Sequence, residues 1–166
     1  MNKKLIILAM SFGLVISAFA DMEQRKAGLI YYLLKNVEYP DTKSTTDSYI
    51  ITVYGSDAMQ QQLEKITANK KIANRSIVIK RANTIQEIKD SHIVYLADEY
   101  AKDFLKARYV ANSYGAMLIT ESEGFGAKGA QINFVNFDGS VEFEINKTAL
   151  KEVSVRLSAR LMDMSS

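Results

Sequence analysis

Four short apolar runs separated by helical segments constrain the fold of this chain more than any other feature. The runs lie at 49–54, 76–80, 93–97 and 116–120, and each is almost continuously apolar. Such runs are typical of parallel strands, because helices bury both faces of a parallel sheet. We therefore expect an α/β fold: a single three-layer α/β/α domain with about six strands, most of them parallel.

Two later runs differ because polar and apolar residues alternate in them. Residues 131–134 and 141–145 show this alternation, and residues 136–139 between them (NFDG) have the composition of a tight turn. The alternation predicts strands with one face in water, and the turn predicts that the two strands pair antiparallel. The sheet should therefore end in a C-terminal antiparallel hairpin.

Helical spacing of apolar residues and the position of cap residues predict three helices before this hairpin. The first is expected between residues 22 and 38, where Pro40 follows as a stop, and the second from Ser56 or Asp57 to about Thr67. Another is expected after Asp98, which can act as its cap, and it should turn Phe104 and Leu105 toward the core. Each helix should bury one face against the sheet.

A last helix is expected to begin at Asn146, a residue type that caps helices well. Glu152 can pair with Arg156 one turn later on this helix. The apolar stripe that should pack on the sheet comprises Leu150, Val153, Leu157 and Leu161.

The first twenty residues have the three parts of a secretory signal. Two lysines precede an apolar run at residues 5–16, and Ala18-Phe19-Ala20 provides a small-residue cleavage site. The apolar run is shorter than the ~20 residues that a membrane-spanning helix needs. We expect residues 1–20 to be a cleaved signal peptide and residues 21–166 to form one domain in the periplasm.

The charge balance of that domain argues against nucleic acid as a partner. Without the two lysines of the signal, 19 basic residues face 19 acidic ones, whereas nucleic-acid binding needs a clustered positive excess. The sequence has no cysteine, so we expect neither a disulfide nor a thiol-linked lipid anchor. Beyond residue 20, no apolar run is long enough to cross a membrane.

A glycine-rich segment at residues 124–129 (GFGAKG) matches the G-x-G-x-x-G pattern of dinucleotide-binding proteins. In those proteins a helix begins at the glycines, so that its amino end faces the pyrophosphate. Here an alternating strand follows, and no lysine with serine or threonine completes a phosphate-binding loop. We interpret the segment as a turn-rich loop and expect no cofactor.

Few other residues are candidates for chemistry. His92 is the only histidine, and its place at the start of an apolar strand favours a structural role over catalysis or zinc binding. Glu121 and Glu123 follow a predicted parallel strand, at the end where open α/β sheets bind ligands. We expect no catalytic residue and no metal. The candidate ligand or partner loop comprises Glu121, Glu123, Gly124, Phe125, Gly126 and Gly129.

Several strings occur in the order seen in one protein family. They lie at residues 31–40, 124–125, 131–134, 143–146 and 157–161. On these strings the chain resembles the YfiR family over residues 22–164. The positions that carry the family signature here are Tyr39, Pro40, Phe143, Asn146 and Ser158.

The resemblance implies a periplasmic regulator and no enzyme. YfiR-type proteins hold a membrane-bound diguanylate cyclase inactive by contacting its periplasmic sensor domain; release raises cyclic-di-GMP and favours biofilm formation. The implied partner is therefore an inner-membrane signalling protein of this kind. An outer-membrane lipoprotein that sequesters the regulator and a second copy of the chain are further candidate partners. Many relatives have a cysteine where this chain has Ser91, so redox control through disulfides is not expected here.

Two other classes of function stay open at this point. The chain can be a periplasmic small-ligand-binding module without a cyclase partner, with a site at the strand ends near Gly55-Ser56, Ala97-Asp98 and residues 121–129. It can also be an exported hydrolase that uses His92 or a pair of acids. Thermal-shift screening against small molecules tests the first, and activity of a His92→Ala variant tests the second.

Overall fold

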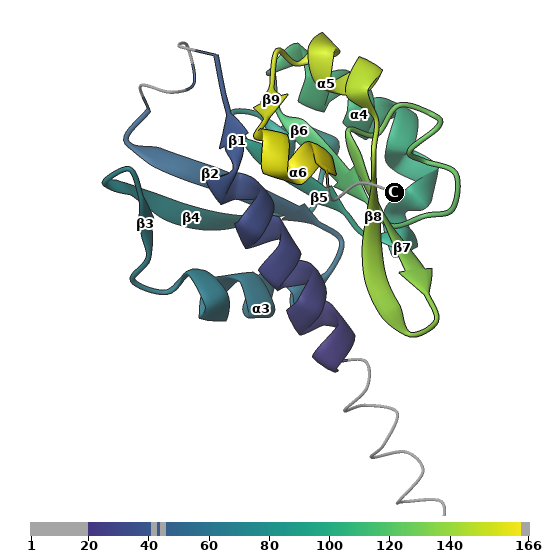
Figure 1. Cartoon of the computed structure of the whole chain (residues 1–166), viewed down its shortest axis with the longest axis horizontal. Coiled ribbons are helices and arrows are strands. Elements are labelled where there is room, and N and C mark those ends of the chain that lie inside the picture. Colours follow the sequence, from purple (N-terminus) through teal and green to yellow (C-terminus); the bar gives the residue numbers. More distant parts are fainter. Residues whose placement is uncertain (1–19, 41–42, 44–45, 164–166) are drawn as a thin grey trace, which may run out of the picture.

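The computed structural model describes residues 20–40, 43 and 46–163 (Figure 1). The predicted signal peptide therefore lies, except for Ala20, outside the described residues. The described residues form a twisted sheet with helices on both of its faces (Figure 1).

The middle layer is a seven-stranded sheet with the order β3-β4-β2-β5-β6-β7-β8. Five neighbouring strands run parallel: β4 (Arg75–Ala82), β2 (Ser48–Tyr54), β5 (Ile93–Leu96), β6 (Met117–Thr120) and β7 (Ile132–Phe137). Two antiparallel strands, β3 (Lys71–Ile72) and β8 (Ser140–Ile145), form the edges. The predicted α/β class and mostly parallel sheet are confirmed, with seven strands where about six were expected.

Helices cover the two faces of the sheet and complete three layers (Figure 1). One face packs against the helix at residues 20–35, called the first helix below, and against α3 (Asp57–Thr67), α5 (Lys147–Glu152) and α6 (Ala159–Asp163). The other face packs against α4 (Phe104–Ser113) and the 3₁₀ helix η1 (Ile85–Ile88); a second 3₁₀ helix, η2 (Asp98–Asp103), leads into α4. Each face therefore has its own hydrophobic core.

The central strand β5 explains why the parallel strands are continuously apolar. Ile93 and Tyr95 lie in the core on the side of the first helix, whereas Val94 and Leu96 lie in the core on the side of α4. All four side chains are buried. Because neither face of this strand meets water, apolar residues are favoured at every position.

β7 and β8 form the predicted antiparallel hairpin. Asp138 and Gly139 make its turn with positive φ angles of 49° and 76°, as a two-residue hairpin turn of this type requires. Phe143 pairs with Phe134 and is buried, whereas Glu142 is exposed. The hairpin therefore has one dry face and one wet face.

The prediction of a single long helix from Asn146 is wrong. α5 ends at Glu152, Ser154 turns the chain with a φ of 55°, and the short strand β9 (Arg156–Leu157) follows before α6. β9 pairs antiparallel with β1 (Val37–Glu38), just after the first helix. The apolar spacing predicted which side chains are buried, but a distant strand decided the backbone conformation.

Two local contacts differ from expectation for the same reason. Glu152 pairs with Arg108 of α4, whose Nη2 lies 3.0 Å from its Oε2, and Arg156 lies beyond the turn. Asp98 makes no side-chain cap; its backbone N–H donates instead to Glu121 at 3.0 Å. In both cases a tertiary partner replaces a local one.

Candidate functional site

The carboxyl ends of β2 and β5 form the place in this sheet where a ligand site is expected. From β2 the chain crosses to β4 on one side, and β5 then returns to the other side of β2. Connections that leave neighbouring strands in opposite directions open a crevice at which α/β sheets bind ligands.

A cavity of about 300 Å³ lies at these carboxyl ends. Four carboxylates and one ammonium group surround it, and we call it the anionic cavity. The residues that line it are Glu23, Lys26, Ser56, Ala97, Asp98, Glu99 and Glu121. The structure thus brings the predicted site residue Glu121 together with the 97–98 and 56 positions named from the sequence.

Lys26 links the first helix to the sheet across this cavity. Its Nζ donates to Glu23 Oε1 at 2.8 Å and to Glu121 Oε2 at 2.5 Å. Burial acts to lower the pKa of Lys26, but the bonds to Glu121 and Glu23 outweigh it and raise the pKa above its ordinary value. The lysine therefore stays charged between two carboxylates.

Sequence reasoning missed Glu23 and Lys26, although a signal for them exists. Glu23 lies one helical turn before Ala27 and Lys26 one turn before Ile30, and both of these apolar residues are fully buried, so the two charged residues share the apolar face of the first helix. Charged residues on the buried face of an amphipathic helix are unusual unless they are paired. That anomaly points to an ion pair with another element.

Two polar atoms beside this ion pair have no hydrogen-bond partner among the described residues. They are Oε2 of Glu23 and the hydroxyl of Tyr95, both buried. Burial, followed by the charges of Glu121 and Glu23, raises the pKa of Tyr95 well above its ordinary value. The Tyr95 hydroxyl thus lies near both carboxylates without meeting the geometry of a hydrogen bond.

The predicted loop at residues 121–129 is a series of turns and opens no helix, so the glycines do not build a dinucleotide site. Glu123 and Gly124 are exposed, and Phe125 stacks on Phe104 with ring centroids 4.2 Å apart. Gly129 has a φ of 107°, and a Cβ there would lie 2.5 Å from Nε of Arg108. The loop is therefore shaped by packing against α4.

Asn146 connects this loop to the start of α5. Its Oδ1 accepts from Ala149 N at 2.9 Å, and its Nδ2 donates to the Gly126 carbonyl at 2.8 Å. A second cavity of about 480 Å³ is lined by Gly126, Asn146 and Glu144, among others, and not by Glu121. Asn146 thus has a structural role as a helix cap and loop tie.

The other signature positions lie away from the anionic cavity. Tyr39 donates to the His92 carbonyl at 2.9 Å, and together with Pro40 it lines a cavity of about 350 Å³ near Arg156. The backbone N–H of Ser158 donates to Asn36 O at 2.9 Å. Phe143 belongs to the core, so these positions support the fold at several separate places.

His92 lies at the opposite, amino ends of the strands. Its Nδ1 accepts from Ile50 N at 3.1 Å, and its Nε2 lies 3.3 Å from the Lys43 carbonyl oxygen. Tyr39 and Tyr49 each pack edge-on against the ring, with centroids 5.1 Å away. Burial, with the nearby Lys43 charge, lowers the pKa of His92 to about 4. The ring is neutral, engaged on both nitrogens and structural.

α4 presents an exposed apolar pair to solvent. Leu105 is 73% and Tyr109 75% exposed, and lysines 102 and 106 close to them in the sequence are exposed as well. The expectation that Leu105 faces inward is wrong. Phe104 is buried as expected, and its neighbour Leu105 lies on the opposite, solvent-facing side of α4.

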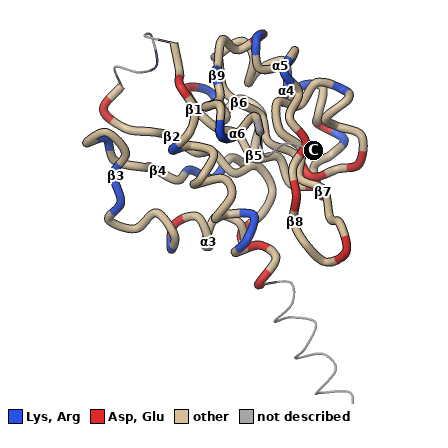
Figure 2. Tube along the Cα trace, in the orientation of Figure 1, with Lys and Arg blue, Asp and Glu red and all other residues tan. Residues whose placement is uncertain are grey.

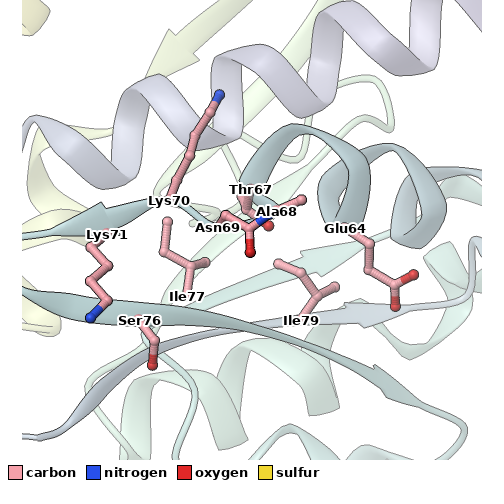
Figure 3. Close-up of a pocket in the computed structure, with 9 residues that line it drawn as sticks. All are labelled: Glu64, Thr67, Ala68, Asn69, Lys70, Lys71, Ser76, Ile77 and Ile79. Atoms are coloured by element: carbon pink, nitrogen blue, oxygen red, sulfur yellow. The ribbon is translucent and has the colours of Figure 1, made fainter.

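A further cavity of about 380 Å³ lies between the end of α3 and the neighbouring strands β3 and β4 (Figure 3). Ile77 and Ile79 of β4 line it together with Lys70, which extends toward the first helix (Figure 3). Lys70 Nζ lies 4.7 Å from the centroid of the Tyr31 ring. Its long side chain therefore serves to pack the first helix against this edge.

The described residues contain no group of three or more histidines, cysteines and acids that could hold a metal ion. None of the helices within 20–163 is long and apolar enough to cross a membrane. Figure 2 shows acidic and basic positions interspersed along the described chain, as the balanced composition predicts.

Comparison with known proteins gives a family match and likenesses to solved structures. The profile of a family described as YfiR/HmsC-like matches residues 23–166. Among curated proteins, none matches the sequence. A conserved domain protein from Vibrio cholerae is similar in structure, with 15% identity and a TM-score of 0.62. The ABC domain from Streptococcus pneumoniae in complex with L-Trp is similar with 14% identity and a TM-score of 0.56.

Each likeness covers 87% of this chain but only 59% of the solved structure. At such low identity the two structures support the fold and carry no information about ligands or partners. The family match covers the described residues almost entirely and is the stronger finding.

Proposed function

Because the chain belongs to the YfiR/HmsC-like family, we propose that it is a periplasmic repressor of an inner-membrane diguanylate cyclase. The family match over residues 23–166 carries this proposal. The family consists of periplasmic regulators of cyclic-di-GMP signalling, not of enzymes. Under the proposal, residues 1–20 are a cleaved signal peptide and residues 21–166 form the domain that contacts the periplasmic part of the cyclase.

The exposed face of α4 is the contact surface that the geometry favours. Leu105 and Tyr109 lie one helical turn apart, and each exposes about three quarters of its surface. Apolar and aromatic anchors of this kind carry much of the binding energy at interfaces. Lysines 102 and 106 flank the pair, so the surface suits an apolar patch with an acidic rim.

Repression also requires a preference between two states of the partner. A regulator lowers cyclase activity only if it binds the inactive conformation more tightly than the active one. Binding through α4 would then shift the cyclase toward the inactive state without any chemistry in this chain.

Substitution of the α4 anchors tests the proposal in cells. A Leu105→Glu/Tyr109→Glu variant should raise cyclic-di-GMP to the level of a deletion strain, while the protein stays folded and present in the periplasm. Phe137→Glu is the matched control, because Phe137 is 67% exposed at the tip of the β7–β8 hairpin, away from α4. Unchanged cyclic-di-GMP in the deletion strain itself would refute the function.

Crosslinking in the intact envelope identifies the partner. A photoreactive residue at position 109 should trap an inner-membrane diguanylate cyclase, and the same residue at exposed Gln61 of α3 should not. Capture only of an outer-membrane lipoprotein, or of a second copy of the chain, would contradict α4 as the cyclase-binding surface.

A further inference from the structure

The anionic cavity contains a buried hydrogen-bond acceptor for which the described residues provide no donor. Oε2 of Glu23 has no partner among the described residues, although Glu23 is only 3% exposed and lines the cavity. Buried polar groups without partners are rare because they have lost their bonds to water, so each calls for an explanation.

Negative charges outnumber positive ones around the cavity, which also favours a donor with positive charge. Glu23 and Glu121 share one cation, Lys26, while Asp98 and Glu99 at the rim face no cation among the lining residues. Asp98 Oδ1 accepts from the neutral Ser122 hydroxyl, at 2.5 Å. The cavity therefore has an excess of carboxylates and favours a positively charged ligand.

Lys26 shows which cation these carboxylates suit. Its ammonium group sits between Glu23 and Glu121 at 2.8 and 2.5 Å, at the end of an aliphatic chain. The protein thus already holds one alkylammonium group at this place. The free Oε2 of Glu23 and the rim acids offer acceptors for more groups of the same kind.

Two other ligand classes fit the cavity less well. The acids are too dispersed to enclose a metal ion, since no metal-binding group occurs among residues 20–40, 43 and 46–163. An anion would need the amino end of α3, but there Ser56 Oγ already accepts from Met59 N at 3.1 Å and Asp57 adds a negative charge.

We infer that the anionic cavity binds a small aliphatic diamine, one ammonium group at Glu23 and Glu121 and the other at Asp98 and Glu99. The first ammonium donates to the free oxygen of Glu23 as the Lys26 side chain moves aside. The inference goes beyond the proposed regulatory function, and binding of such a ligand by the purified protein requires no cyclase.

Isothermal titration of the protein purified from the periplasm tests the inference, with 1,4-diaminobutane as the probe. The diamine should bind saturably, with an affinity that falls as salt rises. Glu23→Gln should weaken binding at least about tenfold, because it removes the charge at the buried acceptor. Asp98→Asn/Glu99→Gln, at an exposed rim where folding is not at risk, should weaken it by a similar factor.

The controls separate the cavity from general charge attraction. Glu142→Gln removes one exposed acid on β8 and should leave the affinity unchanged. Butylamine, with one ammonium group, should bind at least about tenfold more weakly than the diamine. No saturable binding, equal binding by Mg²⁺, or equal loss in Glu142→Gln and the rim variant would overturn the inference. None of these results would bear on repression of the cyclase, which is measured in cells.

Discussion

The two ends of the central strands hold polar clusters of opposite character. At the amino ends, His92 lies among Lys43, Arg75 and two tyrosines, and both of its ring nitrogens have partners. At the carboxyl ends, a carboxylate oxygen of Glu23 in the anionic cavity and the nearby hydroxyl of Tyr95 have no hydrogen-bond partner among the described residues. The first cluster is cationic and bonds both nitrogens of its histidine, although Nε of Arg75 has no partner there; the second is anionic and leaves an acceptor of its central carboxylate unbonded.

The difference separates a structural cluster from a candidate site. Partnered buried polar groups stabilise a unique arrangement, whereas unpartnered ones lower the stability of the fold. Proteins break such local rules mainly where function requires it. Stability measurements at the two ends should therefore differ in size and in pH dependence.

The largest effect is expected at the amino ends, from His92→Ala. The substitution leaves Ile50 N–H without its acceptor and opens a space between Tyr39 and Tyr49. We expect the free energy of unfolding to fall by about 3–4 kcal/mol, measured by urea denaturation. Gln61→Ala, an exposed change on α3, is the control. A loss below about 1 kcal/mol would show that the cluster is not structural.

At the carboxyl ends, Lys26→Met should cost about 2–3 kcal/mol at neutral pH, because it leaves Glu23 and Glu121 without their shared cation. The double variant Glu23→Gln/Lys26→Met should recover part of the stability. If the double variant is less stable than Lys26→Met alone, repulsion between the two carboxylates is not the cause of the loss in Lys26→Met.

Acid should lower the stability that the cluster around His92 contributes. The pKa of His92 is about 4 in the folded chain, below its ordinary 6.5, so the folded state binds this proton less readily than the unfolded state. Neutral His92 stabilises the fold above pH 6.5, and this contribution to the free energy of unfolding should be lost as the pH falls toward 4. The pKa difference sets an upper limit of about 3 kcal/mol, and we expect a loss of about 2 kcal/mol. The sole histidine makes His92→Gln a clean comparison, and an unchanged acid slope in that variant would contradict the assignment.

The smallest effect is expected from Tyr95→Phe, also at the carboxyl ends. The substitution removes a buried hydroxyl that has no partner, so the free energy of unfolding should change by less than about 0.5 kcal/mol or rise slightly. Thermal unfolding of both proteins measures it. A loss above about 1.5 kcal/mol would mean that the hydroxyl is bonded after all, for instance to ordered water.

The sequence predicted the sheet better than the segments that close over it. β5 is apolar throughout, and β2 and β6 are mostly apolar, because both of their faces are largely buried, and that pattern is local. The C-terminal segment could not be predicted in the same way. Helical spacing from Leu150 to Leu161 fits a helix, but Leu157 pairs with Val37, and no local pattern reports a partner so far away.

The sequence predicted only part of the candidate site. Glu121 follows a parallel strand, so its place at the ligand-binding edge comes from topology alone. Glu23 and Lys26 come from a helix whose direction across the sheet depends on packing, and only the structure brings them to Glu121. His92 was correctly interpreted as structural because an apolar strand follows it.

The pairing of β1 with β9 has a consequence for the order in which the chain can mature. Val37 meets Leu157, and so closes a loop of about 120 residues, a contact that forms late because distant segments must first be brought together. A chain that emerges amino end first must wait for residues 156 and 157 before the first helix is fastened. Until then chaperones and proteases can reach the apolar face of the first helix. Pairing of this two-residue strand should therefore mark the point at which the chain becomes resistant to both.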